Sequence, residues 1–335
     1  MKEPKSEPKL SWLSYAGRSG STRLAKTLAE RGRNLVVVPE SRVTEFVLGG
    51  GPKDSKNLTK EFVLQRIKND VQIAQYTDAS AAEIATRLVS AAHSGDWLGF
   101  VYEVASMCTQ LSLEEIRDAD ELIFKLGDAV FIWDELQARL PESQLIYVHR
   151  HPCGVANSQL GSVSPYRTSE DMGRGDLWHC VSTWKASARA ALAASDCKMV
   201  SFEQVLHGDV LALLDIEEST DEVVSRFQVA SAEEMIHPLI SLPSDSSRLD
   251  AWKSGLSSDQ QRLVAFIAGD YAEALGYGLP SRASLRIVAR GFLLHIYRSS
   301  LYGVRRLWEY KHSPVEVIAH LRLRSRRYLG LDKNR

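Results

Sequence analysis

A loop of small and basic residues near the start of the chain has the composition of a site that binds oxyanions. The loop is Gly17-Arg-Ser-Gly-Ser-Thr22, between an apolar stretch at 11–16 and a helical pattern at 22–32. Its two glycines permit a tight turn that leaves backbone N–H groups free. Hydroxyl and guanidinium groups add donors and positive charge, and the positive end of the helix dipole points at the turn. These features are suited to holding a phosphate or a similar anion.

A second basic site follows a later apolar stretch. Residues 144–149 predict a buried strand that ends at Arg150, and Ser158 follows on the opening of a helix. An arginine fork and a hydroxyl group near a helix N-terminus also bind anions. In open α/β sheets, ligands bind at the carboxyl edge of the strands, so we expect both loops to meet at this edge.

The first loop differs from the common nucleotide-binding sequences. It lacks G-x-x-x-x-G-K-[ST], whose lysine reaches the terminal phosphates of a nucleoside triphosphate, and it lacks the dinucleotide pattern G-x-G-x-x-G. A kinase-like phosphotransferase or a nucleotide hydrolase would also need a carboxylate that holds Mg²⁺. The loop alone leaves an ordinary strand-to-helix turn open as an alternative, and the second basic site favours anion binding.

The elements that must position these loops alternate between strands and helices. We predict strands at 11–16, 35–38, 122–125, 144–149 and 198–202, with a strand or buried turn at 97–102. Helical spacing predicts helices at 22–32, 59–75, 79–93, 129–140, 178–194, 203–214 and 256–274. This alternation predicts an α/β fold, in which a parallel sheet forms the middle of three layers and helices cover both of its faces.

The composition is that of an ordinary globular protein, with 44% hydrophobic and 25% charged residues in 335. The four cysteines are scattered without C-x-x-C spacing, which argues against a disulfide framework or a zinc site and favours reduced thiols. We find no apolar run of the ~18 residues that a membrane-spanning helix needs. The polar, proline-containing N-terminus lacks the apolar region of a signal peptide, so we expect a cytoplasmic protein.

Charge divides the chain unevenly. Residues 282–335 carry 13 Lys or Arg and 3 Asp or Glu, whereas the remainder is acidic. We therefore expect a disordered lead-in at 1–10, an α/β domain at 11–280 and a basic helical C-terminal extension at 281–335. Two interpretations of the extension stay open: helices packed on the domain, or a helix that contacts a membrane surface or a partner.

The two loops resemble the signatures of sulfotransferases that use 3′-phosphoadenosine 5′-phosphosulfate (PAPS). Residues 18–22 resemble the family's P-[RK]-S-G-[ST]-T loop for the 5′-phosphosulfate, with Gly17 in place of the proline. Residues 146–152 with Ser158 resemble its 3′-phosphate segment. The resemblance spans about 11–280 and implies the P-loop NTPase-like sulfotransferase fold, PAPS as donor, 3′-phosphoadenosine 5′-phosphate (PAP) as product, and no metal. It implies these donor-binding residues: Arg18, Ser19, Gly20, Ser21, Thr22, Arg23, Arg150, Ser158, Phe202 and Arg248.

Three further stretches support the resemblance. Val200–Leu206 resembles the family's V-x-Y-E-D-L-L segment, and its Phe202 is either an adenine contact or a core aromatic residue. Arg248-Leu-Asp-Ala-Trp-Lys253 resembles the R-x-x-x-W-K stretch, whose loop carries a basic residue that caps the 3′-phosphate. Lys125-Leu-Gly-Asp128 partly matches a K-x-P segment found in many bacterial members.

The general base that the resemblance implies is Glu40, which comes just after the second predicted strand. It corresponds in position to a glutamate that takes the acceptor proton in many bacterial and carbohydrate sulfotransferases, and Arg18 would act at the leaving group. The alternative for Glu40 is a solvated carboxylate that caps a helix at 41–48. The rival base is a histidine: His149 and His151 flank the phosphate segment, which leaves His93 as the candidate.

The acceptor is expected to be a hydroxyl or amine of a small molecule or carbohydrate, with no role for nucleic acid; a lipid or a phenol also stays open. Acceptor contacts are expected from loops at 41–60, 93–112 and 159–177, which contain Trp97, Tyr102, Tyr166, Arg167, Asp171 and Arg174. A protein of another class stays open as well: a non-catalytic nucleotide- or glycan-binding protein on the same fold.

Overall fold

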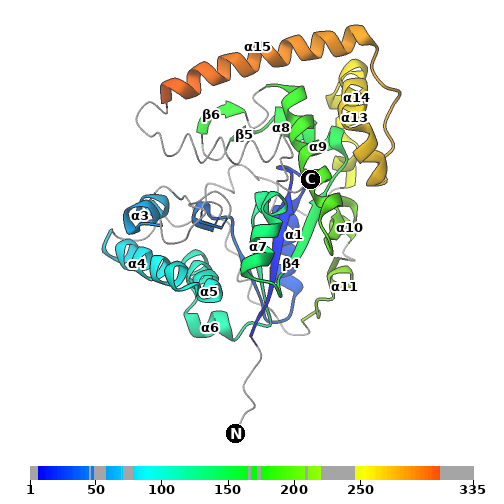
Figure 1. Cartoon of the computed structure of the whole chain (residues 1–335). Helices are drawn as coiled ribbons and strands as arrows, with labels where there is room; N and C mark the ends of the chain where they lie inside the picture. Colours follow the sequence, from blue (N-terminus) through cyan, green and yellow to red (C-terminus); the bar gives the residue numbers. More distant parts are fainter. Residues whose placement is uncertain are drawn as a thin grey trace.

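A five-stranded parallel sheet forms the centre of the protein (Figure 1). The computed structural model describes residues 7–44, 47–48, 58–68, 70, 78–164, 167–171, 175–207, 210–219 and 246–309. Across the sheet the strands are β2 (Leu35–Val38), β3 (Glu121–Lys125), β1 (Lys9–Tyr15), β4 (Gln144–His149) and β7 (Lys198–Ser201). The predicted parallel sheet is therefore confirmed.

Alternation along the strands sends side chains into two cores. In β1, Trp12 belongs to one apolar cluster and Leu13 to the other, and in β4 Tyr147 and Val148 divide in the same way. The Leu13 side packs on α1 (Ser21–Arg31), α10 (Phe202–His207) and α11 (Val210–Leu214). Because helices cover both faces, the fold is the three-layer α/β arrangement that the sequence predicts.

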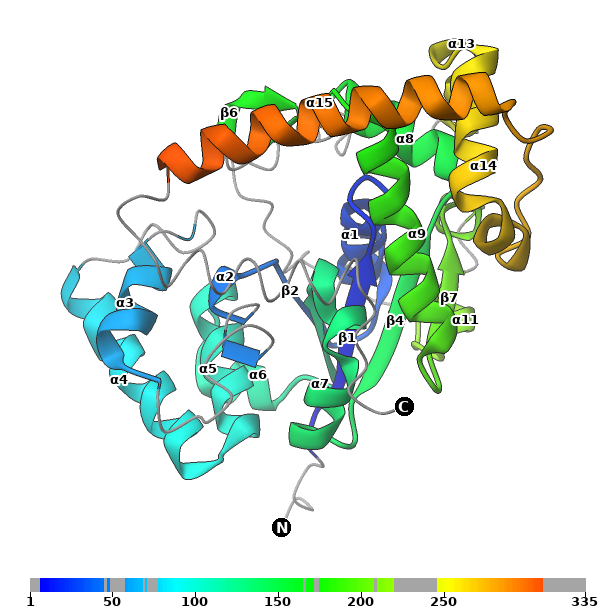
Figure 2. The same cartoon turned by 45° about the horizontal axis from the view of Figure 1, so that its top comes forward.

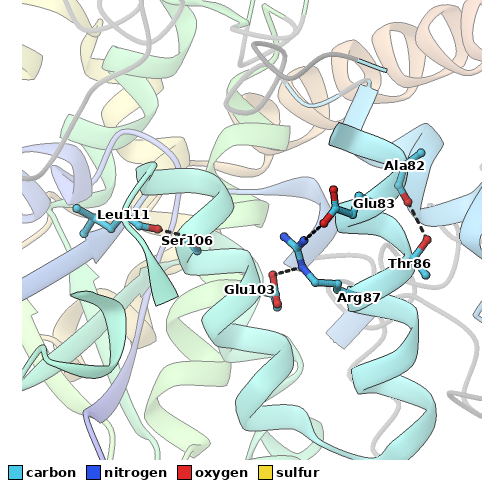
Figure 3. A network of polar contacts seen from close by, with 7 residues as sticks. All are labelled: Ala82, Glu83, Thr86, Arg87, Glu103, Ser106 and Leu111. Atoms are coloured by element: carbon cyan, nitrogen blue, oxygen red, sulfur yellow. Dashed lines mark hydrogen bonds and ion pairs between the residues drawn. The ribbon is translucent and has the colours of Figure 1, made fainter. Parts of the chain in front are cut away.

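The Trp12 face is covered by the helices between β2 and β4. These are α2 (Arg42–Thr44), α3 (Lys60–Lys68), α4 (Asp78–Ser94), α5 (Trp97–Thr109), α6 (Leu113–Arg117), the 3₁₀ helix η3 (Gly127–Phe131) and α7 (Trp133–Arg139). On the outside of this layer, Arg87 of α4 pairs with Glu83 at 2.8 Å and with Glu103 of α5 at 3.0 Å (Figure 3). This exposed network joins two helices away from the sheet.

The helix α5 corrects the prediction of a strand or buried turn at 97–102. Asp96 caps the helix, because its carboxylate accepts a hydrogen bond of 2.8 Å from the Gly99 N–H. A short apolar run is compatible with a buried helix as well as with a strand. The capping residue before the run and the length of the segment distinguish the two. The expected acceptor loop at 93–112 is therefore mostly helical.

A third apolar cluster joins the remaining helices at the end of the molecule to which the strands point. It contains parts of α8 (Pro152–Leu160), α9 (Leu177–Ala193), α13 (Ala251–Gly255) and α14 (Ser258–Ala274). A two-stranded antiparallel ribbon, β5 (Val163–Ser164) and β6 (Arg167–Asp171), lies beside α8, and the 3₁₀ helix η4 (Ser246–Leu249) precedes α13. Figure 2 shows the helix α15 (Leu285–Glu309) crossing the outside of this end.

The ends of the chain differ in part from expectation. The first strand begins at Lys9, so residues 9 and 10 of the expected disordered lead-in belong to the sheet. The extension is helical over 285–309, whereas residues 1–6 and 310–335 lie outside the described residues. Within the described part of the chain, no helix is both long and apolar enough to cross a membrane. All four cysteines are unpaired in the structure.

Candidate active site

The loop after β1 turns sharply into α1. Arg18 and Gly20 both adopt left-handed backbone conformations, with φ of 72° and 96°. The Ser19 N–H donates to the Ala16 carbonyl at 3.1 Å, and the Gln159 side chain donates to the Gly17 carbonyl at 2.8 Å. The helix begins without a side-chain cap and without an acidic residue in its first turn. Its first N–H groups therefore face the loop without a competing carboxylate, as an anion site requires.

The two predicted anion-binding segments meet in space. The register of β1 and β4 places Tyr15 opposite Val148, so the chain leaves both strands at the same level of the sheet. Beyond the strands, the Arg18 Nε donates a hydrogen bond of 3.0 Å to the Ser158 Oγ. Residues separated by 140 positions in the sequence thus form one site, as the sequence predicts from strand polarity.

Arg150 crosses the middle of this site. Its guanidinium lies 4.5 Å from the Phe202 ring centroid, and its Nη2 donates 2.7 Å to the Arg248 carbonyl. The Trp184 indole donates 3.0 Å to the Arg150 carbonyl, which fixes the backbone. A Cβ at Gly154 would lie 3.0 Å from the Arg150 Nε, so the absence of a side chain there gives the guanidinium room.

Three arginines share the site and repel one another. The pKa of Arg150 is lowered to about 10, mainly by burial; Glu203 opposes this shift, and the positive charges of Arg18 and Arg248 contribute to it. Burial and the charge of Arg248 likewise lower the pKa of Arg18. An anion placed among these three guanidinium groups would remove their mutual repulsion.

Two buried polar atoms in the site have no hydrogen-bond partner among the described residues. They are the Ser19 Oγ and the Arg150 Nε. A buried donor without a partner costs free energy that a bound acceptor would recover. Together with the bare N-terminus of α1, these atoms fit a ligand that carries oxyanions at two places.

Phe202 is a core aromatic residue, one of the two roles that the sequence leaves open for it, and its contact with adenine stays a prediction. It begins α10 rather than ending a strand, and it belongs to the apolar core beneath α1. Its ring also lies against Gly20, where a Cβ would come within 2.2 Å of the Phe202 Cδ2. The Phe202 ring therefore has two contacts in the site. It packs against the loop at Gly20, and the Arg150 guanidinium lies over its face.

We expect Gly20→Ala to destabilise the protein more than Gly276→Ala does. Both glycines have positive φ, but a Cβ at Gly276 would meet nothing within 4 Å. The left-handed backbone costs an alanine about 1–2 kcal/mol at either position, and the collision with Phe202 adds roughly 1–3 kcal/mol. Urea unfolding of the two variants measures the difference. Equal losses of unfolding free energy would show that Phe202 does not press on the loop.

Glu40 lies on the other side of the loop. It follows β2, and its Oε2 accepts a hydrogen bond of 2.8 Å from the Tyr15 hydroxyl at the end of β1. Lys125 is 3% exposed, and its ammonium lies 5.6 Å from the centroid of the same Tyr15 ring. The sheet thus places a half-buried carboxylate and a buried cation beside the start of the anion-binding loop. We expected Glu40 there; the Tyr15 contact could not be read from the sequence.

Comparison with known proteins shows the family to which the chain belongs. Residues 16–219, more than half of the chain, match the sequence model of the Sulfotransferase family. The chain belongs to the sulfotransferase family. The matched part contains both anion-binding loops, Glu40 and Phe202, whereas Arg248 and α13–α15 follow it.

One solved structure supports the fold of this sulfotransferase, and a second is similar to a lesser degree. The sulfotransferase domain of the Synechococcus PCC 7002 olefin synthase superposes with a TM-score of 0.51 at 18% identity, covering 83% of this chain and 99% of that domain. The sulfotransferase domain of the curacin biosynthetic pathway has a TM-score of 0.48 at 19% identity, covering 83% of this chain and 100% of that one. No curated protein sequence matches the chain significantly.

The histidines near the site of this sulfotransferase are held in structural roles. The His149 Nδ1 lies 2.9 Å from the Tyr277 hydroxyl, and burial lowers the pKa of His149 to about 4. The His151 Nδ1 accepts from the Cys153 N–H, so its Nε2 carries the proton and donates to the Gly278 carbonyl. His93 lies on α4, and its Nε2 is 2.9 Å from the Leu58 carbonyl. These contacts favour Glu40 over a histidine as base.

Two supporting residues were absent from our sequence prediction, and a third, Trp252, appeared there only as part of the R-x-x-x-W-K stretch. Gln159 and Trp184 hold backbone carbonyls of the two loops, and Trp252 stacks on His151 with centroids 4.3 Å apart. The predicted Arg23 lies half-exposed on the first turn of α1, while Ser21 and Thr22 are buried there. No group of three or more His, Cys, Asp or Glu side chains suited to a metal occurs within the described ranges.

The expected acceptor residues are only partly described. Tyr102 is 4% exposed in the core of α5, which corrects its assignment to an acceptor loop. The Arg139 guanidinium lies over Trp97, 4.6 Å from the centroid of the Trp97 ring. Arg167 and Asp171 lie on β6 with only their backbone described; Tyr166, Arg174 and most of 45–57 lie outside the described residues.

Proposed function

We propose that this sulfotransferase moves a sulfuryl group from PAPS to a hydroxyl or amine of a small-molecule or carbohydrate acceptor. The observation that carries the proposal is the meeting of Arg18, Arg150 and Arg248 at the bare N-terminus of α1, beside the unpartnered Ser19 Oγ. Three cations and two unsatisfied donors suit a ligand with a phosphosulfate and a separate phosphate. We place this reaction in the cytoplasm.

Each residue then has a separate task. The N–H groups of the loop, Ser19, Ser21 and Thr22 would hold the 5′-phosphosulfate, with Arg18 at the bridging oxygen. Arg150, Ser158 and Arg248 would hold the 3′-phosphate, and Phe202 would support both sides. Arg23 is assigned to the same donor site from its place in the motif.

PAPS supplies an activated sulfuryl group on a phosphate leaving group. During transfer the bond between sulfur and the phosphate oxygen breaks, and a bond from sulfur to the acceptor oxygen or nitrogen forms. Arg18 and the loop donors stabilise the negative charge on the departing phosphate. Glu40 takes the acceptor proton, with its carboxylate oriented by the Tyr15 hydroxyl. Lys125 adds positive charge at the same edge of the sheet. No step requires a metal.

Isothermal calorimetry with PAP and with ATP plus Mg²⁺ tests the donor. We expect PAP to bind without metal, and to bind far more tightly than ATP, because the loop lacks the lysine that reaches a terminal phosphate. A preference for ATP with Mg²⁺ would replace the proposal with a kinase-like phosphotransferase. Tight PAP binding together with no sulfuryl transfer to any acceptor would indicate a nucleotide-binding protein without catalysis.

A further inference from the structure

The outer side of α15 is an apolar surface with no cover among the described residues. Seven of the ten exposed large apolar side chains in the described part of the chain lie on this helix. Apart from Phe292, they are Leu285, Leu293, Leu294, Ile296, Tyr297 and Leu301, which are between 46% and 85% exposed. Contiguous exposed apolar surface on a folded protein commonly marks an interaction site.

The inner side of α15 is firmly attached to the domain. Phe292 packs on Trp178 with ring centroids 5.5 Å apart, and the His295 Nδ1 lies 2.6 Å from the Asp176 carboxylate. Gly291 lies directly against Leu263 of α14, where a Cβ would approach to 2.6 Å. These contacts fix which side of α15 faces the domain. The exposed apolar side chains therefore lie on the opposite, outer side. Both views show the helix lying across the outside of the molecule (Figures 1 and 2).

Apart from Glu309 at its last position, the charged residues of α15 are all arginines. No acidic residue occurs between positions 274 and 308, whereas Arg286, Arg290 and Arg298 lie among the exposed apolar residues. Within the described ranges none of these three arginines forms an ion pair, in contrast to Arg282, which pairs with Asp270 at 2.5 Å. Arg286, Arg290, Leu293 and Tyr297 follow at spacings of 4, 3 and 4, so they share one face of the helix.

This mixture fits an anionic lipid surface better than a second copy of the chain. In a two-fold contact the same face meets itself, so Arg286 and Arg290 of the two copies would oppose one another, and no acidic residue between positions 274 and 308 could pair with them. At a bilayer surface, leucine and tyrosine enter the interface while arginine side chains reach the lipid phosphates. Attraction to anionic lipids adds to the apolar contribution.

We propose that α15 docks the protein on the surface of an anionic membrane, with Leu293 and Tyr297 entering the interface and Arg286 and Arg290 contacting lipid phosphates. Because α15 crosses the end of the molecule to which the strands point, docking places the candidate active site on the membrane side. The docking proposal does not depend on which donor or acceptor the active site binds.

Flotation of the full-length protein with vesicles tests the docking. The vesicles are neutral phosphatidylcholine, or phosphatidylcholine with phosphatidylserine, at low and at high salt. We expect flotation with the anionic vesicles only, weakened by salt, and lowered roughly tenfold or more by Leu293→Glu with Tyr297→Glu. The matched control is Leu213→Glu, an apolar residue of α11 with 39% exposure, which should float like the wild type.

A second variant pair, Arg286→Ser with Arg290→Ser, should lower flotation without adding negative charge to the helix. Circular dichroism confirms that each variant is folded. Absence of flotation with anionic vesicles would overturn the proposal. Flotation that neither α15 variant reduces would overturn it too, because another part of the chain would then bind the lipid. So would a dimer in sedimentation velocity that the α15 variants dissociate, since the face would then join two copies.

Discussion

Replacing Glu40 with glutamine is expected to lower the turnover of sulfuryl transfer by a factor of ~10²–10⁴. A hydroxyl is a weak nucleophile at neutral pH, and the amide of glutamine takes up no proton from it. The glutamine keeps the size of the side chain and still accepts the Tyr15 hydrogen bond, which is 2.8 Å in the native protein. The measurement is the rate of PAP release from PAPS, with an acceptor that the wild-type protein turns over.

Two further measurements distinguish Glu40 as the base from Glu40 as a carboxylate with a structural role. PAP affinity should be unchanged in Glu40→Gln, because the donor contacts we assign come from the loop arginines and hydroxyl groups. Glu103→Gln supplies a matched control, since Glu103 pairs with Arg87 on the exposed α4–α5 network (Figure 3) and should leave turnover intact. If Glu40→Gln turns over PAPS as fast as the wild type, Glu40 is not the base.

Arg150→Ala is expected to weaken PAP binding roughly 30- to 1000-fold, a range that corresponds to about 2–4 kcal/mol for one hydrogen-bonded charge pair. The guanidinium is held between the Phe202 ring and the Arg248 carbonyl, so its fork is fixed before the ligand arrives. Arg150→Lys should recover part of the affinity, because lysine keeps the charge and loses the planar fork. Calorimetric titration with PAP gives both values.

The stability of the unliganded protein should change little in Arg150→Ala. Burial and the neighbouring arginines both lower the pKa of Arg150, which means that its charge is unfavourable in the empty site. Removing the side chain relieves that cost while it removes the contact with Phe202. Thermal unfolding checks this, and Arg87→Ala serves as a control arginine that should bind PAP normally. A large drop in melting temperature would mean that Arg150 acts mainly in folding.

The sequence predicted the parts of the fold and site that depend on local pattern. The apolar run at 144–149 predicts its strand, and strand polarity then places Arg150 and Ser158 beside the first loop. The three consecutive valines at 36–38 predict the strand that Glu40 follows, whereas its role as base came only from the family resemblance. The strand and loop predictions use the spacing of apolar residues, the chemistry of the side chains and the direction of the chain, all of which can be read from a single sequence.

The parts that escaped prediction depend on contacts between distant residues. The hydroxyl of Tyr15 and the indole of Trp184 point to partners 25 and 34 positions away, and nothing in their neighbours specifies the pairing. Tyr102 was assigned to an acceptor loop because the apolar run at 97–102 was too short to separate a helix from a strand. The signal that could have corrected this is Asp96, whose side chain begins α5 as its cap.

The most direct test of the account is a cycle of four calorimetric titrations, in which PAP and 5′-AMP are each bound to the wild type and to Arg150→Ala. The two nucleotides differ only in the 3′-phosphate. We predict that the wild type prefers PAP by roughly 100-fold and that Arg150→Ala removes most of this preference while 5′-AMP binds as before. Equal affinity of the wild type for PAP and 5′-AMP, or a preference that survives in Arg150→Ala, would contradict the assignment of this site to the donor.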